Sequence, residues 1–105
     1  MKNLLLGDIA YARSGDKGPD VNVGIIFKDK KGYDWGVNNL TEKKMKDYFT
    51  DMVKGPVVRY TLSNLYALNF ILHDSLGGGG SETLVNDAQG KTFGQAVLMM
   101  EIDYK

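Results

Sequence analysis

Two stretches of this 105-residue chain combine glycines with side chains that could do chemistry. In the first, glycines would let backbone amides approach an anion closely, and two cations would supply positive charge. A hydroxyl could add a ligand contact, and a carboxylate could act as a general base. The residues concerned are Arg13, Ser14, Asp16, Lys17 and Asn22. The spacing is not the GxxxxGK[ST] of a phosphate-binding P-loop, and the alternative is a solvated turn between two strands.

The second stretch holds the only histidine of the chain, His73. Histidine changes charge near neutral pH, so His73 is the natural proton carrier, with Asp16 or Asp74 to orient it. If this stretch is helical, Asn69 lies on the same face, four residues earlier. The polar and glycine ligand contacts expected after it are Gly78, Gly79 and Ser81. The alternative is a half-buried histidine that bonds a carbonyl, followed by a flexible glycine connector.

Hydropathy patterns predict the elements that position these residues. The apolar segment Leu4–Ala12 predicts a strand, and the turn-rich segment Arg13–Asp20 predicts a loop. Apolar residues alternate over Val21–Phe27, which indicates a half-buried strand. The charged segment Lys28–Gly32 predicts a solvated turn, and Trp35 is expected in a loop after it.

The clearest predicted helix is Glu42–Val53, in which apolar residues such as Met45 and Phe49 recur at helical spacing. The Thr41 hydroxyl can accept a free amide of the first turn. Pro56 cannot continue the helix, so the helix should end before it.

The remaining segments predict a strand, a helix and a last strand. Alternation over Val58–Leu62 predicts a third strand. Leucines at helical spacing over Leu65–Leu76 favour a helix, although the apolar residues at 68, 70 and 72 also fit a strand. A turn is expected at Asn86–Gly90 and a final strand over Leu98–Tyr104.

These elements predict one α+β domain over residues 1–105. It should be a two-layer sandwich, with a mainly antiparallel sheet and about two helices on one face. Tyr11 and Tyr60 are expected in the core. A domain of this size leaves apolar surface uncovered, and a free sheet face or edge invites another chain. We therefore expect a homo-oligomer, most simply a dimer through the sheet or its edge.

The composition excludes several classes of function. The 13 basic and 13 acidic residues balance, which argues against a nucleic-acid partner. The absence of cysteine excludes thiolate chemistry and Cys-ligated zinc, and one histidine cannot build a multi-His site. We expect no metal and no cofactor. No apolar run suits a membrane helix, and the apolar amino terminus is too short for a signal peptide, so a cytoplasmic protein without membrane contact is expected.

Four segments carry a resemblance to a known family. They are Asp8–Gly18 with Asn22–Gly24, then Val53–Tyr60, Asn64–Gly79 and Asp87–Thr92. They resemble the signature of the AtuA-like acyclic terpene utilisation proteins, whose carboxyl-terminal domain is described as ferredoxin-like. The departures from that pattern are Pro19, Val21 and Gly80.

The resemblance implies a partner and a ligand. In the longer relatives this domain follows a large amino-terminal domain in the same polypeptide, so a separate AtuA-like large subunit is the implied partner. The family's setting is the breakdown of branched isoprenoid acids, which implies an acyl-CoA or related carboxylate ligand.

Two main functions follow as hypotheses. In the first, the chain is a binding and assembly module, and its two chemistry-bearing stretches meet at one end of the sheet. In the second, the chain is a catalytic subunit for hydration, isomerisation or hydrolysis of an acyl thioester. There His73 acts as acid or base, Arg13 and Lys17 hold the ligand's negative charge, and glycine amides stabilise an oxyanion. A plain homodimer without a ligand is a third alternative.

Overall fold

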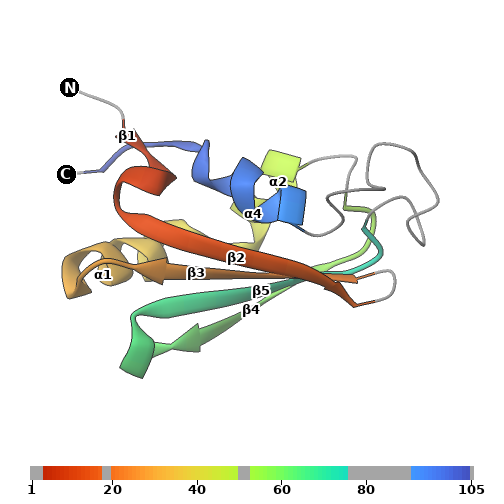
Figure 1. Ribbon diagram of the computed structural model, residues 1–105, viewed down its shortest axis with the longest axis horizontal. Helices are drawn as coiled ribbons and strands as arrows, with labels where there is room; N and C mark the ends of the chain where they lie inside the picture. Colours follow the sequence, from red (N-terminus) through yellow and green to blue (C-terminus); the bar gives the residue numbers. More distant parts are fainter. Residues whose placement is uncertain (1–3, 18–19, 50–52, 76–90, 105) are drawn as a thin grey trace.

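Four antiparallel strands form the main sheet, in the spatial order β2–β3–β5–β4 (Figure 1). The computed structural model describes residues 4–17, 20–49, 53–75 and 91–104, without the side chains of residues 16, 17, 91 and 92. The strands of the main sheet are β2 (Ala10–Lys17), β3 (Asp20–Phe27), β4 (Val57–Leu62) and β5 (Ala67–Leu72). A small second sheet pairs β1 (Leu4–Leu5) with β6 (Glu101–Ile102).

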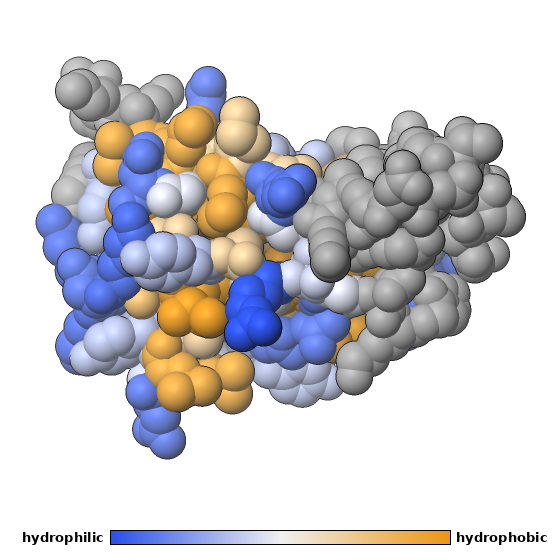
Figure 2. All heavy atoms as spheres, viewed as in Figure 1, coloured by the Kyte–Doolittle hydropathy of each residue, from blue (hydrophilic) through white to orange (hydrophobic). Residues whose placement is uncertain are grey.

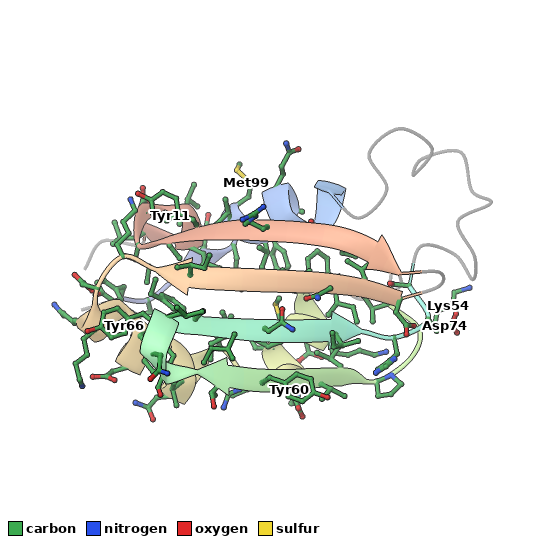
Figure 3. The ribbon with its side chains drawn as sticks, turned by 60° about the horizontal axis from the view of Figure 1, so that its bottom comes forward. Tyr11, Lys54, Tyr60, Tyr66, Asp74 and Met99 are labelled. Carbon is green, nitrogen blue, oxygen red and sulfur yellow. The ribbon has the colours of Figure 1, made fainter. Side chains whose placement is uncertain are left out.

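The helices of the described segments cover one face of the main sheet. The helices of the described segments are α1 (Lys30–Asn39), α2 (Glu42–Phe49) and α4 (Lys91–Leu98), with two 3-10 turns, η1 (Leu6–Asp8) and η3 (Ser63–Leu65). Figure 3 shows the four strands side by side in front, with the helices behind them. We call the helix side the covered face and the other side the open face. This arrangement confirms the predicted α+β class, with three helices where about two were expected.

The core lies between the covered face and the helices. Alternate residues of a strand point to opposite faces, so the apolar positions of β3 and β5 all reach the same side. The buried residues of these two strands on that side are Val21, Val23, Ile25, Phe27, Leu68, Phe70 and Leu72. The helices and the segment between α1 and α2 add Leu40, Met45, Phe49, Phe93 and Val97.

The predicted helix after Thr41 is confirmed from Glu42 to Phe49, but Val53, expected at its end, instead forms a β-bridge with Ser75. The backbone N–H of Lys44 donates to the Thr41 hydroxyl at 3.1 Å, which is the expected cap. Met45 and Phe49 are buried, and the helix is described as far as Phe49. Its Tyr48 hydroxyl donates to the Ala96 carbonyl at 2.7 Å, and burial raises the pKa of that hydroxyl, so it stays a donor.

The predicted turn over Lys28–Gly32 and the loop at Trp35 are wrong, because helix α1 begins there. Asp29 caps it: the backbone N–H of Gly32 donates to the Asp29 carboxylate at 2.8 Å. Trp35 lies in α1, and its indole N–H donates to the Asp103 carbonyl at 3.2 Å, which ties the helix to the carboxyl-terminal segment. Glycines and charged residues hid this helix from the hydropathy pattern.

The predictions for the amino-terminal segments also need correction. The strand expected over Leu4–Ala12 is interrupted by η1, and β2 begins only at Ala10. The loop expected from Arg13 is wrong, because β2 runs to Lys17 and pairs with β3 throughout. Polar residues are tolerated there because β2 is an edge strand with one face in solvent.

The segment Leu65–Leu76 is not a helix. η3 and Tyr66, which has a left-handed backbone (φ 52°), lead into β5, so the strand period was the right alternative. β5 pairs with β3 on one side and β4 on the other. The final strand expected over Leu98–Tyr104 is short, because α4 continues to Leu98 and only β6 follows. The turn expected at Asn86–Gly90 lies outside the described residues.

Candidate functional site

The sheet register joins the two chemistry-bearing stretches of the sequence. Arg13 of β2 lies opposite Gly24 of β3, and Gly24 lies opposite Asn69 of β5. Asn22 lies opposite Ile71 in the next row on the same face. The described parts of the two stretches therefore lie in neighbouring strands of one sheet, and Asp20 and His73 meet at its end.

Three rows of residues cross the open face, one from each strand in turn. In the order β2, β3, β5, β4, the rows are Tyr11–Ile26–Ala67–Leu62, Arg13–Gly24–Asn69–Tyr60 and Gly15–Asn22–Ile71–Val58. The middle row holds a cation, an amide and a phenol, with a glycine between the first two. Gly24 has no side chain, and the Asn69 amide oxygen lies 3.6 Å from the position that a Gly24 Cβ would take.

A histidine–carboxylate pair lies at the end of these rows. His73 Nδ1 and Asp20 Oδ2 are 3.2 Å apart, and Asp20 Oδ1 accepts the backbone N–H of Asp74 at 2.9 Å. Asp20 therefore orients the imidazole, a role that the sequence suggested for Asp16 or Asp74. When Nδ1 of the neutral imidazole carries the proton and donates it to Asp20, Nε2 carries none. Nε2 is then the nitrogen that can accept a proton.

The backbone of His73 and Asp74 is hydrogen-bonded to the segment that precedes β4. The His73 N–H donates to the Pro56 carbonyl at 3.0 Å, and the Gly55 N–H donates to the His73 carbonyl at 2.9 Å. The Lys54 N–H donates to the Asp74 carbonyl at 3.0 Å, and Figure 3 shows these two residues together at the end of the sheet. The pair thus lies on a fixed extension of the β4–β5 ladder, which suits a functional group that needs a set orientation.

Ser14 does not join this group, because it lies on the covered face. Its hydroxyl accepts the backbone N–H of Gly94 in α4 at 2.8 Å. A Cβ at Gly94 would approach the Ser14 hydroxyl to 2.7 Å, so α4 packs on β2 at very close range. Ala12, Arg13, Ser14 and α4 line a groove of about 340 Å³ at this edge.

Replacing Ser14 with alanine is expected to lower the free energy of unfolding by about 1 kcal/mol, because the Gly94 amide loses its acceptor. Urea unfolding of the Ser14→Ala variant would measure this. Ser63→Ala, at an exposed position in η3, is the control and should change stability by less than about 0.5 kcal/mol. An unchanged stability of Ser14→Ala would contradict a structural role for this hydroxyl.

Several other predicted contacts cannot be placed. Gly78, Gly79 and Ser81 lie outside the described residues. Asp16 and Lys17 lie opposite Val21 and Asp20 in the register, but their side chains are not described.

The open face also exposes large apolar and aromatic side chains. Tyr11 is 61% exposed and Tyr60 54%, so the expectation that they belong to the core is wrong. Leu62 and Ile26 are exposed beside them, at 42% and 36%. Figure 2 shows hydrophobic side chains at the lower edge, where Figure 1 places the η3 end of β4 and β5. The pattern of the strands could have found these positions, since they alternate with the buried ones.

The rest of the described structure offers a groove but no metal site. Within the described residues, no group of three or more His, Asp or Glu side chains is arranged to hold a metal ion. A groove of about 500 Å³ lies between α2 and β6, lined by Lys43, Lys44, Tyr48 and Glu101 among others. None of the helices in the described segments has the length and apolar character to cross a membrane.

Comparison with known proteins places the fold and both stretches in one family. The AtuA ferredoxin-like domain matches residues 4–103 of the chain, a range that includes every strand described above. No match was found among curated proteins or among solved structures. The match covers nearly the whole sequence, so the chain belongs to the AtuA ferredoxin-like domain family.

Proposed function

We propose that this chain is an accessory subunit that works with a separate AtuA-like large subunit in acyl-CoA or branched isoprenoid acid catabolism. The observation that carries the proposal is the convergence of Arg13, Asn22, Asn69 and His73 on the open face of an AtuA ferredoxin-like domain. In this proposal the chain contributes part of an anion-recognising site and the large subunit contributes the rest.

The polar residues of the open face have the chemistry for a carboxylate or phosphate. The Arg13 guanidinium can bind either group in a bidentate manner, and the amides of Asn22 and Asn69 can donate to it. Lys17 pairs with Asp20 in the register, so its backbone lies at the His73 end of the sheet. Charge-assisted hydrogen bonds of this kind contribute roughly 1.5–3 kcal/mol each.

The shape of the site favours a shared site over an independent enzyme. Small-molecule sites enclose most of their ligand, and catalysis gains from the exclusion of water. The open face is one exposed sheet surface, with His73–Asp20 as its one described histidine–carboxylate pair. A second surface is therefore needed to close a site over it, and the large subunit is the proposed source.

Co-expression of the chain with an AtuA-like large subunit tests the proposal. The two proteins should purify as one complex and bind 3-methylcrotonyl-CoA, a branched acyl-CoA, in calorimetric titrations. Lys17→Ala should weaken this binding by about 10- to 100-fold, the equivalent of one charge-assisted hydrogen bond, without lowering the melting temperature. Lys44→Ala, at an exposed position of α2, is the matched control.

Two results would contradict this proposal. One is the absence of a complex with the large subunit. The other is a Lys17→Ala variant with a lower melting temperature and unchanged affinity for 3-methylcrotonyl-CoA, which would make this residue structural.

The His73–Asp20 pair supports a catalytic subunit as the second candidate function. There Nε2 of His73 takes a proton from the substrate or from water, and Asp20 holds the ring through Nδ1. In the complex, His73→Gln should then abolish turnover of 3-methylcrotonyl-CoA, which offers a double bond to hydrate or isomerise and a thioester to hydrolyse. Asp20→Asn should lower kcat and alter its pH profile with little change in KM. If His73→Gln changes only affinity, the chain is a binding module.

A further inference from the structure

Within the described segments no helix covers the open face, although apolar and aromatic side chains are exposed on it. A solvated face of an antiparallel sheet normally alternates polar residues with the buried ones. Here the outer positions of the edge strands include Tyr11, Tyr60 and Leu62, and β3 adds Ile26, all exposed. Grouped exposed apolar residues of this kind mark a contact surface.

The edge at β4 is a poor place for another chain to add a strand. The outward backbone N–H of Arg59 already donates to the Glu42 carboxylate at 2.8 Å. The Arg59 side chain turns to the helix layer, where its guanidinium donates to the carbonyls of Val37 and Leu40, both at 3.0 Å. These contacts occupy the middle of the β4 edge, as natural proteins do to prevent strand addition. The face, not this edge, is left for a partner.

The rows of the open face complement one another about a two-fold axis. An axis that runs along the strands, between β3 and β5, places β2 of one copy over β4 of the other and β3 over β5. In the middle row, Arg13 then faces the partner's Tyr60, and Asn69 faces the partner's Gly24. Arginine over a phenol ring is a favourable cation–π pair, and Gly24 adds no side chain opposite the partner's Asn69.

The neighbouring rows complement one another in size. Tyr11 faces the partner's Leu62, and Ile26 faces the row position of the partner's Ala67, which is itself 4% exposed. In the third row, Gly15 faces the partner's Val58. In these two rows, large residues thus face small or apolar ones. The one mismatch places Asn22 opposite the partner's Ile71, at the rim of the face next to His73. We propose that two copies of this chain pair through their open faces about this axis.

Other arrangements of the two faces are less favourable. A two-fold axis across the strands at the middle row would place β2 over β2, so Arg13 would face the partner's Arg13. The proposed axis also tolerates sheet twist. Packed sheets cross at about 30°, and the edge strands lie about 7 Å from the axis, so the pairs there shift by only about 3–4 Å.

The area of the face suits a small dimer. Four strands at about 4.8 Å spacing and six residues at about 3.3 Å give a face of about 19 by 20 Å. Two such faces together project about 760 Å², which is in the size range of weak, transient interfaces below about 1,200 Å². Because the axis runs along the strands, both His73–Asp20 pairs lie at the same end of the dimer, outside the paired rows. The paired rows bury Arg13 and Asn69, so this homodimer and the proposed complex with a ligand and the large subunit are alternative, mutually exclusive uses of the open face.

The test starts from the isolated wild-type chain, so it is independent of the large subunit. Sedimentation should give twice the 11.6 kDa mass of one copy at concentrations on the order of 100 μM. Tyr60→Arg places a cation against the partner's Arg13 at two symmetric contacts, and should raise the dissociation constant at least about 30-fold. Met99→Arg, at a 64% exposed position outside the open face, should leave it unchanged.

A charge exchange shows whether Tyr60→Arg acts by breaking the proposed contact between copies or by unfolding the chain. Adding Arg13→Glu to Tyr60→Arg makes the facing charges opposite and should restore the dimer. Within one chain these positions are separated by three strand spacings, about 14 Å, so the restored contact can form only between copies. A monomeric wild-type chain, a Tyr60→Arg variant as dimeric as the wild type, or a double variant that stays monomeric would each overturn the proposal.

Discussion

Replacing Phe70 with alanine is expected to lower the free energy of unfolding by about 3–5 kcal/mol. Phe70 is fully buried at the centre of β5, where it lies opposite Val23 of β3 and Arg59 of β4. Removal of its ring leaves a cavity between the sheet and the helices that the paired strands cannot close. Urea unfolding monitored by circular dichroism measures the loss.

The residue before Phe70 supplies the control. Asn69 lies on the open face of the same strand, and Asn69→Ala should change stability by less than about 1 kcal/mol at a protein concentration where the chain is monomeric. Equal losses for the two variants would contradict the assignment of covered and open faces, and would favour the helix that the leucine spacing suggested.

The second large effect on stability is expected for Gly36→Ala, and its sign is opposite to the one that helix propensities predict. Alanine in place of glycine inside a helix normally stabilises by about 1 kcal/mol. A Cβ at Gly36 would come within 2.4 Å of the Phe27 ring, and Phe27 is itself buried. We therefore expect Gly36→Ala to destabilise the protein by about 1–3 kcal/mol through overpacking.

A double-mutant cycle separates overpacking from other causes. Phe27→Leu shortens the facing side chain and destabilises by itself, because it removes buried surface. Combined with Gly36→Ala, it should recover at least about 1 kcal/mol relative to the sum of the two single losses, since the clash is gone. Strict additivity in thermal or urea unfolding would show that α1 does not pack on Phe27 as described.

Local sequence signals were sufficient for some elements. The alternation of β3 and the apolar spacing of α2 each reflect one element with one buried side, and Thr41 caps its helix through a contact three residues away. The signature segments also identified the family, which the domain match confirms. These features depend on neighbours along the chain, so the sequence carries them directly.

Other elements were ambiguous because their apolar residues fit both the helical and the strand period, or neither period. The segment from Ala67 to Leu72 fits a helix and a strand, and only pairing with β3 and β4 on both sides decides for the strand. Arg13 and Ser14 look like loop residues, yet β3 holds them in an edge strand. Helix α1 has few apolar residues, and its sequence signal was the Asp29 cap alone.

The sequence by itself determined the family, the α+β class, the strands at Val21–Phe27 and Val58–Leu62 and one helix with its cap. It also determined which residue types could bind an anion or carry a proton. The tertiary structure alone decided the partner of His73, because Asp20 lies 53 residues earlier and only the β3–β5 register brings them together. It also decided that Tyr11 and Tyr60 lie on an open face, since exposure depends on which side the helices cover. Side-chain periodicity records that a strand has two different faces, but the packing of distant segments determines which face meets solvent.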